Sequence, residues 1–178
     1  MAGSSRMTRT GNVHWTGSKE WDIVIATGED LIAVAEVKSQ VGSFGNNFNN
    51  RVEEALGNAT DFWTAYRKGL YAPSQRPWLG YLFMIEEHAV SLRPTKKILL
   101  APFQVDRVFQ EISYAARYEE VCIRLVRELL YDASCFITSN QAEGDSGIFK
   151  QPNSELSIQN FAASLHAKVS AFVAHKRS

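Results

Sequence analysis

Residues 21–40, WDIVIATGEDLIAVAEVKSQ, constrain the fold of this chain more than any other stretch. Two apolar, β-branched runs flank the Gly-Glu-Asp at 28–30, a pattern typical of a β-hairpin with a short loop. If the turn is centred on its glutamate, residue i faces residue 58 − i, and Asp22 lies opposite Glu36. Because side chains alternate between the faces of a strand, Lys38 then shares a face with both carboxylates. A two-residue turn would instead shift the register and place Asp22 and Glu36 on opposite faces.

The acidic pair of this hairpin is a candidate metal site. Directly opposed carboxylates destabilise a strand pair, and partly buried ones are costly unless something neutralises them. The carboxylates of Asp22 and Glu36, with the carbonyl oxygen of Val37, suit a hard cation such as Mg²⁺. Lys38 is placed to orient a water for attack on phosphorus. On spacing alone, a hairpin with solvated ends and an ordinary Asp22–Lys38 surface ion pair stays open as the alternative.

The composition limits the class of protein without deciding its function. The chain has 178 residues, enough for one domain with a real core, and we treat 1–178 as a single domain whose first 20 residues carry little pattern. A formal net charge of +0 gives no global basic field for nucleic acid, although a locally basic cleft stays open. Cys122 and Cys135 lack metal-type spacing and are expected to be free, buried thiols, as in a reducing cytoplasm. No apolar run approaches the ~18 residues of a membrane span, and 1–11 lack the apolar core of a signal peptide.

The rest of the chain alternates helical and strand patterns. Helices are predicted at about 47–67, 105–130 with a break near Ser113, and 154–176; strands are predicted at 78–87 and 133–139, and short strands stay open at 13–15 and 97–101. The first helix has one apolar stripe that includes Leu56, with Asp61 on the opposite face, and an asparagine of the preceding loop is expected to cap it. This order predicts a mixed α/β sheet with helices on both faces.

The hairpin also carries a resemblance to a known class of nucleases. Asp22, then thirteen residues, then Glu36-Val37-Lys38 matches the PD-(D/E)xK pattern, with Trp21 where the superfamily name has proline. The blocks EVKSQVGSFGNNFNNRVEEALGNATDFWTAYRKG, RPWLGYLF and SYAARYEEVCIRLVRELLYDASCFITS closely resemble the XhoI family of type II restriction endonucleases. The resemblance runs from about Trp21 to the C-terminus, and FGNNFNNR is its most distinctive part.

The resemblance implies a restriction-endonuclease-like mixed sheet core flanked by helices. It also implies a homodimeric, Mg²⁺-dependent enzyme that cuts double-stranded DNA at the palindrome CTCGAG and leaves 5′-phosphates, paired with a cognate DNA methyltransferase. In this enzyme Asp22, Glu36 and the Val37 carbonyl would hold Mg²⁺, and Lys38 would position the attacking water. Family members carry a longer N-terminal region, whereas 20 residues precede Trp21 here, so a fragment or an inactive remnant stays open.

Candidate DNA contacts follow directly after the predicted catalytic strand. A polar block opens the first helix, where backbone N–H groups suit phosphate and Asn and Arg side chains suit base edges. The block comprises Asn46, Asn47, Asn49, Asn50 and Arg51. Turn and cap chemistry is the alternative for the asparagines. Gln40, Glu53 and Glu54 are further candidates, with a solvated strand end or a solvated helix turn as their alternatives.

The remaining charged residues give weaker indications. The second helix carries three arginines that face outward or toward a groove, and a solvated helix face is favoured for them, with contact to DNA as the alternative; they are Arg117, Arg124 and Arg127. The four histidines share no metal-type or triad spacing; they are His14, His88, His166 and His175. The aromatic stripe of the first helix is interpreted as core.

Two other functions stay open beside the restriction enzyme. One is a structure-specific repair nuclease of the same superfamily, which the XhoI-like text beyond the acidic pair and lysine disfavours. The other is a remnant that binds DNA without cutting it, which the intact Asp22, Glu36 and Lys38 disfavour. Palindromic sites are read by two-fold dimers, so we expect a homodimer.

Overall fold

One mixed four-stranded sheet organises the computed structural model, which describes residues 20–97 and 105–177. The strands are β1 (Ile23–Thr27), β2 (Asp30–Gln40), β3 (Trp78–Glu86) and β4 (Ala133–Ser139), and they lie in the order β1-β2-β3-β4. The β1–β2 pair is antiparallel, whereas β2–β3 and β3–β4 are parallel. The α/β prediction with a mixed sheet is therefore confirmed, and β3 is a central strand.

The β1–β2 hairpin has a two-residue turn and still keeps the predicted register at the acidic pair. Thr27 pairs with Asp30, so the turn consists of Gly28 and Glu29. A bulge then adds one residue to β2, and Ile23 pairs with Ala35. Residue i therefore pairs with residue 57 − i next to the turn and with residue 58 − i beyond the bulge, and the latter is the predicted register. The bulge therefore returns Asp22 and Glu36 to the same face of the sheet, whereas a two-residue turn alone would have placed them on opposite faces.

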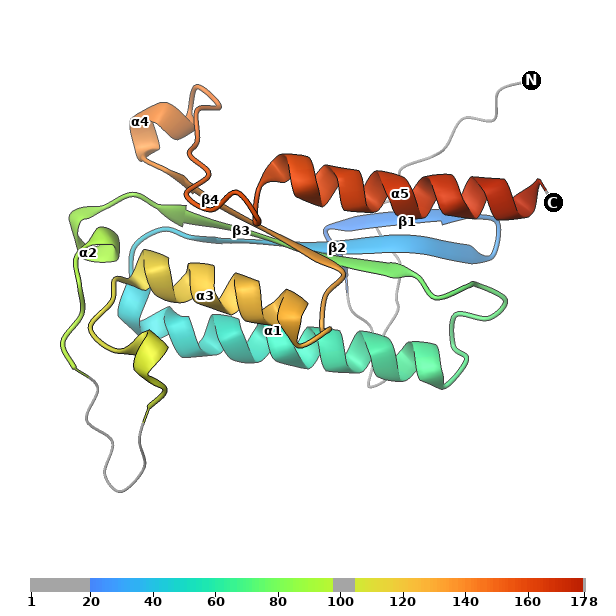
Figure 1. Ribbon diagram of the computed structural model, residues 1–178, viewed down its shortest axis with the longest axis horizontal. Helices are drawn as coiled ribbons and strands as arrows, with labels where there is room; N and C mark the ends of the chain where they lie inside the picture. The colour runs from blue at the N-terminus through green and yellow to red at the C-terminus, as the bar shows by residue number, and fades with distance from the viewer. Residues whose placement is uncertain (1–19, 98–104, 178) are drawn as a thin grey trace.

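Helices cover both faces of the sheet (Figure 1). The helices α1 (Phe44–Arg67) and α3 (Tyr114–Arg127) lie against one face, and α5 (Ile158–Lys176) lies against the other. The larger core cluster is under α1 and α3 and is rich in aromatic side chains, such as Phe62, Phe83 and Phe136. The smaller cluster, under α5, includes Trp78, Cys135 and Phe161. Its close packing explains Gly80 in β3, because a Cβ there would lie 2.2 Å from the Trp78 ring.

The start and the faces of α1 differ from the prediction. The helix begins at Phe44, after Ser43 with a φ of 43° and no side-chain cap, so the prediction of an asparagine cap was wrong. Leu56 is 41% exposed and Asp61 is buried, each opposite to expectation. Asp61 lies one turn after Asn58, which contacts the hairpin residue Glu36. The helix therefore buries a polar residue, Asp61, outside the aromatic stripe that the sequence revealed, and it contacts the hairpin through Asn58.

The later elements largely match their predicted bounds. Strand β4 spans the predicted residues, and the predicted break near Ser113 is real, because that serine caps α3 and a 3₁₀ turn, Arg107–Phe109, precedes it. Two short helices, α2 (Ala89–Leu92) and α4 (Gln141–Gly144), lie in segments for which neither a helix nor a strand was predicted. The candidate strand at 13–15 and most of that at 97–101 lie outside the described residues. Within 20–97 and 105–177, no helix is both long and apolar enough to cross a membrane.

Candidate active site

Asp22 lies at the entrance to β1, where its side chain binds the neighbouring strand. Its Oδ2 accepts a hydrogen bond of 2.8 Å from the backbone N–H of Val37. The preceding Trp21 is buried and packs edge-on against Phe62 of α1, with ring centroids 5.5 Å apart. The tryptophan thus anchors the start of the hairpin, and the carboxylate beside it stays exposed to solvent. The prediction that Asp22 meets the Glu36 segment of β2 agrees with this contact.

Glu36 is a buried carboxylate with a lysine beside it. It is 1% exposed, and its Oε1 lies 2.5 Å from the Nζ of Lys38. The amide of Asn58 on α1 donates to the same oxygen at 3.4 Å. In the parallel register Tyr81 of β3 lies opposite Glu36, and burial, with a smaller effect from this carboxylate, raises the pKa of the tyrosine. Lys38 therefore forms its ion pair with Glu36. The alternative of an Asp22–Lys38 surface ion pair was wrong.

The oxygen donors of this cluster suit one small hard cation. Asp22 and Glu36 come from adjacent strands, and Val37 offers a main-chain carbonyl between Glu36 and Lys38. Among residues 20–97 and 105–177, no group of three or more His, Cys, Asp or Glu side chains is arranged to hold a metal. Mg²⁺ commonly binds through one or two carboxylates and keeps several waters, so this donor set fits it. The same cluster holds an ammonium group beside the carboxylates, as acid–base or water-orienting chemistry needs.

The predicted DNA-contact block lies on the first two turns of α1. Asn46, Asn49 and Asn50 are exposed there, and Asn47 is half-buried. Arg51 is half-buried, forms an ion pair of 2.8 Å with the exposed Glu54, and has a buried Nε. The structure therefore separates the block into three exposed asparagines and two half-buried residues, Asn47 and Arg51.

The three further candidates have different surroundings. Gln40 is 3% exposed and donates to the carbonyl of Gly42 at 2.6 Å, so its interpretation as a solvated strand end was wrong. Glu54 is held by Arg51, and Glu53 is exposed on the first turns of α1, which is the solvated-turn alternative. Among residues 20–97 and 105–177, the side-chain contact of Glu54 is with Arg51, away from the Asp22–Glu36 pair.

Arg117 is the residue that sequence reasoning placed least well. A solvated helix face was favoured for it, with a groove-facing position as the alternative, yet it is buried and donates from Nη2 to the hydroxyl of Thr95 at 2.5 Å. Arg124 is half-exposed and pairs with Glu120 and Asp106, and Arg127 is exposed. The hydrophobic pattern of α3 gave no signal for Arg117, because its burial depends on a loop that is distant in sequence.

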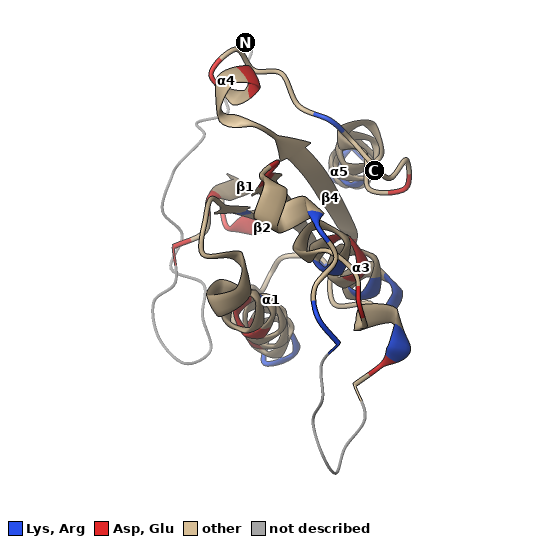
Figure 2. Cartoon of the chain, turned by 90° about the vertical axis from the view of Figure 1, so that its left-hand side faces the viewer, with Lys and Arg blue, Asp and Glu red and all other residues tan. Residues whose placement is uncertain are grey.

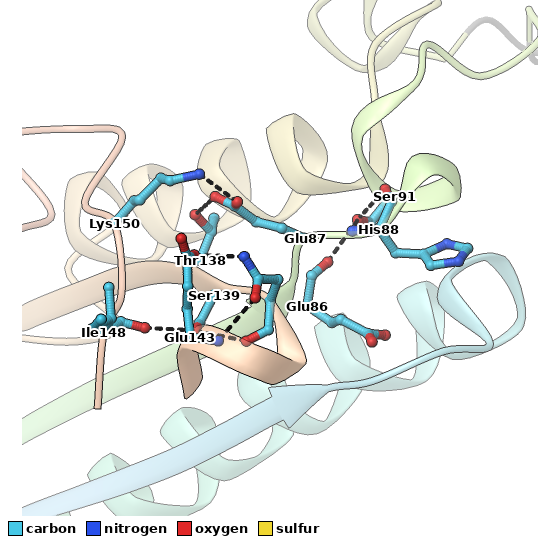
Figure 3. A network of polar contacts seen from close by, with 10 residues as sticks. Glu86, Glu87, His88, Ser91, Thr138, Ser139, Glu143, Ile148 and Lys150 are labelled. Carbon is cyan, nitrogen blue, oxygen red and sulfur yellow. Dashed lines mark hydrogen bonds and ion pairs between the residues drawn. The ribbon is translucent and has the colours of Figure 1, made fainter. Parts of the chain in front are cut away.

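A polar network joins the ends of β3 and β4 (Figure 3). Glu87 accepts hydrogen bonds of 2.6 Å from Thr138 and from the ammonium of Lys150. Glu86 points the other way and accepts from the N–H of Gly42 at 3.1 Å. The two adjacent glutamates therefore fix different segments, one the loop after α4 and the other the connection from β2 to α1.

Replacing Glu87 by glutamine is expected to make stability less sensitive to acid. The Lys150 ammonium and the Thr138 hydroxyl hold the pKa of the Glu87 carboxyl below its usual value. A depressed carboxyl pKa stabilises the fold above the unfolded value of about 4.3, and this stabilisation is lost as pH falls through the folded pKa. Glu87→Gln should cost about 1 kcal/mol at pH 7 and flatten the fall of Tm below about pH 5. Thermal melts of wild type, Glu87→Gln and the exposed-turn control Glu29→Gln measure this; parallel acid profiles for all three would contradict it.

Both cysteines are buried and free, as predicted. Burial raises the pKa of the Cys122 thiol to about 12 and that of Cys135 to about 11. Thiols in this state are protonated and unreactive at neutral pH, so neither is a candidate nucleophile.

A mixed α/β sheet that presents two carboxylates and a lysine on one hairpin is the arrangement of restriction-endonuclease-like proteins. A family model described as restriction endonuclease XhoI matches residues 6–151. The type II restriction enzyme BstVI of Geobacillus stearothermophilus is 42% identical over 158 residues, which cover 85% of this chain and 70% of that enzyme. The chain belongs to the XhoI family of restriction endonucleases, a family of site-specific deoxyribonucleases.

Two further relatives match shorter parts. The type II restriction enzyme XhoI of Xanthomonas vasicola is 41% identical over 115 residues, 64% of this chain and 46% of that enzyme. The type II restriction enzyme AbrI of Azospirillum brasilense is 54% identical over 71 residues, 39% of this chain and 32% of that enzyme. No solved structure matches the chain.

Proposed function

We propose that this chain is a type II restriction endonuclease that hydrolyses double-stranded DNA at a CTCGAG-like palindrome in a Mg²⁺-dependent reaction. The observation that carries the proposal is the hairpin cluster, in which Asp22 binds the N–H of Val37 while Glu36 and Lys38 lie 2.5 Å apart. Family membership supports DNA as the substrate class. The proposed products are a 5′-phosphate and a 3′-hydroxyl at each cut.

Each residue of the cluster has a distinct part in this proposal. Asp22 and Glu36, with the Val37 carbonyl, are the proposed ligands of Mg²⁺. When bound, the cation supplies charge neutralisation at the phosphate and a more acidic water. Lys38 orients the attacking water, and Asn58 and Lys38 fix the buried Glu36 carboxylate in position. The water attacks phosphorus, the bond to the 3′ oxygen breaks, and that oxygen takes up a proton.

The setting of the reaction follows from the same proposal. Asn46, Asn49 and Asn50 are exposed at the start of α1 and are proposed to contact DNA, with Asn47 and Arg51 behind them. A palindrome calls for a two-fold dimer, so the working form is proposed to be a homodimer. The partner enzyme is a DNA methyltransferase that protects the same sequence, and the cytoplasm, where free thiols persist, is the proposed compartment.

Plasmid cleavage tests this function against its two alternatives. One supercoiled plasmid with a single CTCGAG site and one without it are incubated with the protein in Mg²⁺ or in EDTA. Linearisation of the first plasmid alone, in Mg²⁺ alone, is the expected result. Cutting of both plasmids would indicate a repair-type nuclease, and binding without cutting by folded protein would indicate a remnant.

A further inference from the structure

A basic pocket lies at the end of the molecule where the parallel strands finish. It has a volume of about 670 Å³, and its lining includes Gly45 of α1, Tyr114 and Arg117 of α3, and the segment Arg93, Thr95 and Lys96. In Figure 2, which faces this end, basic segments gather between α1 and α3. None of the lining residues in the described part of the chain is acidic. The pocket is therefore a cavity with positive charge and no internal counter-ion.

Arg117 is the buried cation of this pocket. Its side chain is only 6% exposed, and its guanidinium lies 5.4 Å from the centre of the Tyr114 ring and 5.9 Å from that of Phe48. Its Nη2 donates to Thr95, whereas its Nε is buried and has no hydrogen-bond partner in the part of the chain that the structure describes. No Asp or Glu among residues 20–97 and 105–177 forms an ion pair with it, whereas Arg124 on the same helix has two such partners. A buried charge without an opposite charge is unfavourable, so the site favours an anion supplied from outside.

The pocket is held in shape by the chain around it. The N–H and the hydroxyl of Thr95 both donate to the carbonyl of Ile112, at 3.1 and 2.9 Å, which fixes the loop against the start of α3. Gly45 and Tyr114 are in close contact, since a Cβ on the glycine would lie 2.6 Å from the tyrosine hydroxyl. The cation-lined space is thus built by contacts that do not involve the anion.

Two helix N-termini converge on this space. Gly45 is the second residue of α1, and Tyr114 is the first residue of α3. Neither helix has an acidic residue in its first turn. The N-terminal end of a helix attracts anions, and phosphate is a frequent ligand there. The helix ends therefore add to the attraction that Arg117, Arg93 and Lys96 provide.

We propose that this pocket binds a backbone phosphate of the DNA, with Arg117 at its floor and the exposed Arg93 and Lys96 at its mouth. The inference rests on the proposed function, because it assigns a phosphate subsite to the same substrate. The pocket shares Gly45 and Val90 with a neighbouring cavity that reaches the exposed Asn46, so one strand can pass from the phosphate subsite to the asparagines. A phosphate contact positions the duplex and carries no sequence information itself.

The test measures DNA binding by fluorescence anisotropy in Ca²⁺, which replaces Mg²⁺ so that binding is read without cutting. Two duplexes are compared, one with CTCGAG and one without it, over a series of salt concentrations. Arg117→Met should weaken binding to both duplexes by about tenfold and reduce the slope of log K against log salt by about one. Arg127→Met, which removes an exposed arginine of the same helix outside the pocket, should leave affinity unchanged.

Thermal stability separates a phosphate role from a structural one. Without DNA, Arg117→Met should melt at or above the wild-type temperature, because the variant removes a buried charge that lacks a counter-ion. A lowered Tm with unchanged DNA binding would show that Arg117 only supports the fold. If this variant does not fold, the double change Arg93→Gln and Lys96→Gln at the mouth decides: a similar loss on both duplexes supports the proposal, and none overturns it.

The remaining outcomes show which anion the pocket binds, and they separate failure of the phosphate-subsite proposal from failure of the proposed function. An Arg117-dependent rise of Tm in inorganic phosphate, with DNA binding unaffected, would overturn the proposal in favour of a free-phosphate site. A loss confined to the CTCGAG duplex would overturn it in favour of base reading. Wild-type protein that binds neither duplex would overturn it as well. If wild type cuts neither duplex in Mg²⁺ but shows the uniform Arg117 effect in Ca²⁺, the phosphate subsite stands and the proposed function fails.

Discussion

Replacing Lys38 by methionine is expected to reduce the rate of DNA cleavage by about a thousandfold or more, since a positioned acid–base group contributes 10²–10⁴-fold. The Lys38 ammonium lies 2.5 Å from the buried Glu36 carboxylate, so it stands beside one of the proposed metal ligands. Methionine keeps the length and apolar stem of lysine but cannot orient a water. The change should be measured as the single-turnover rate at saturating protein, so that weaker binding does not enter.

The control for this change is Lys68→Met, which removes an exposed lysine at the C-terminal end of α1. Its cleavage rate should equal that of wild type. Removing the partner of a buried carboxylate also destabilises the fold, so Lys38→Met is assayed well below its Tm. A folded Lys38→Met protein that cuts within a few-fold of the wild-type rate would remove Lys38 from the reaction.

Replacing Phe83 by alanine is expected to lower the free energy of unfolding by about 3–5 kcal/mol, the usual cost of truncating a buried phenylalanine. Phe83 is fully buried in β3, and its ring stacks on Tyr118 with centroids 4.2 Å apart. It also lies opposite Lys38 in the parallel register, so it forms part of the layer beneath the proposed catalytic cluster. At 2–4 °C per kcal/mol for a domain of this size, Tm should fall by about 10 °C.

Phe149→Ala provides the matched measurement. Phe149 is 40% exposed in the loop after α4, so its truncation should change stability by less than about 0.5 kcal/mol. Urea titrations of the two variants and wild type give the free energies directly. Equal losses for both variants, or a loss below about 1 kcal/mol for Phe83→Ala, would show that the aromatic layer between β3 and α3 does not support the fold as described.

The sheet and its helices could be predicted because each depends on short-range patterns. The alternating hairpin, the apolar run of β3 and the Ser113 break each specify an element within a few residues. The register of the hairpin was harder to predict. The turn is one residue shorter than expected, and the bulge in β2 compensates for this, so Asp22 and Glu36 still share a face of the sheet. The prediction that Asp22 and Glu36 share a face was therefore correct, although the turn has two residues and not the three that the prediction assumed.

The environment of individual polar residues could not be predicted because it depends on distant segments. Arg117 is buried and donates to Thr95, which lies 22 positions earlier, and Asp61 is buried on α1 outside its apolar stripe. Periodicity within one helix reports only the larger apolar face, so Asp61 was placed on the opposite face and a solvated position was favoured for Arg117. Ser43 begins α1 with a positive φ, which no residue preference at that position indicates.

The most direct test of the proposed catalytic hairpin compares binding with cleavage in Asp22→Asn. The asparagine oxygen can still accept the hydrogen bond from the Val37 N–H, so the hairpin should keep its register while the site loses one negative charge. Anisotropy in Ca²⁺ and single-turnover cleavage in Mg²⁺ are measured on one CTCGAG duplex. Our account predicts binding within a few-fold of wild type and cleavage reduced by at least about 100-fold. Cleavage at the wild-type rate would contradict the assignment of this hairpin as the catalytic centre.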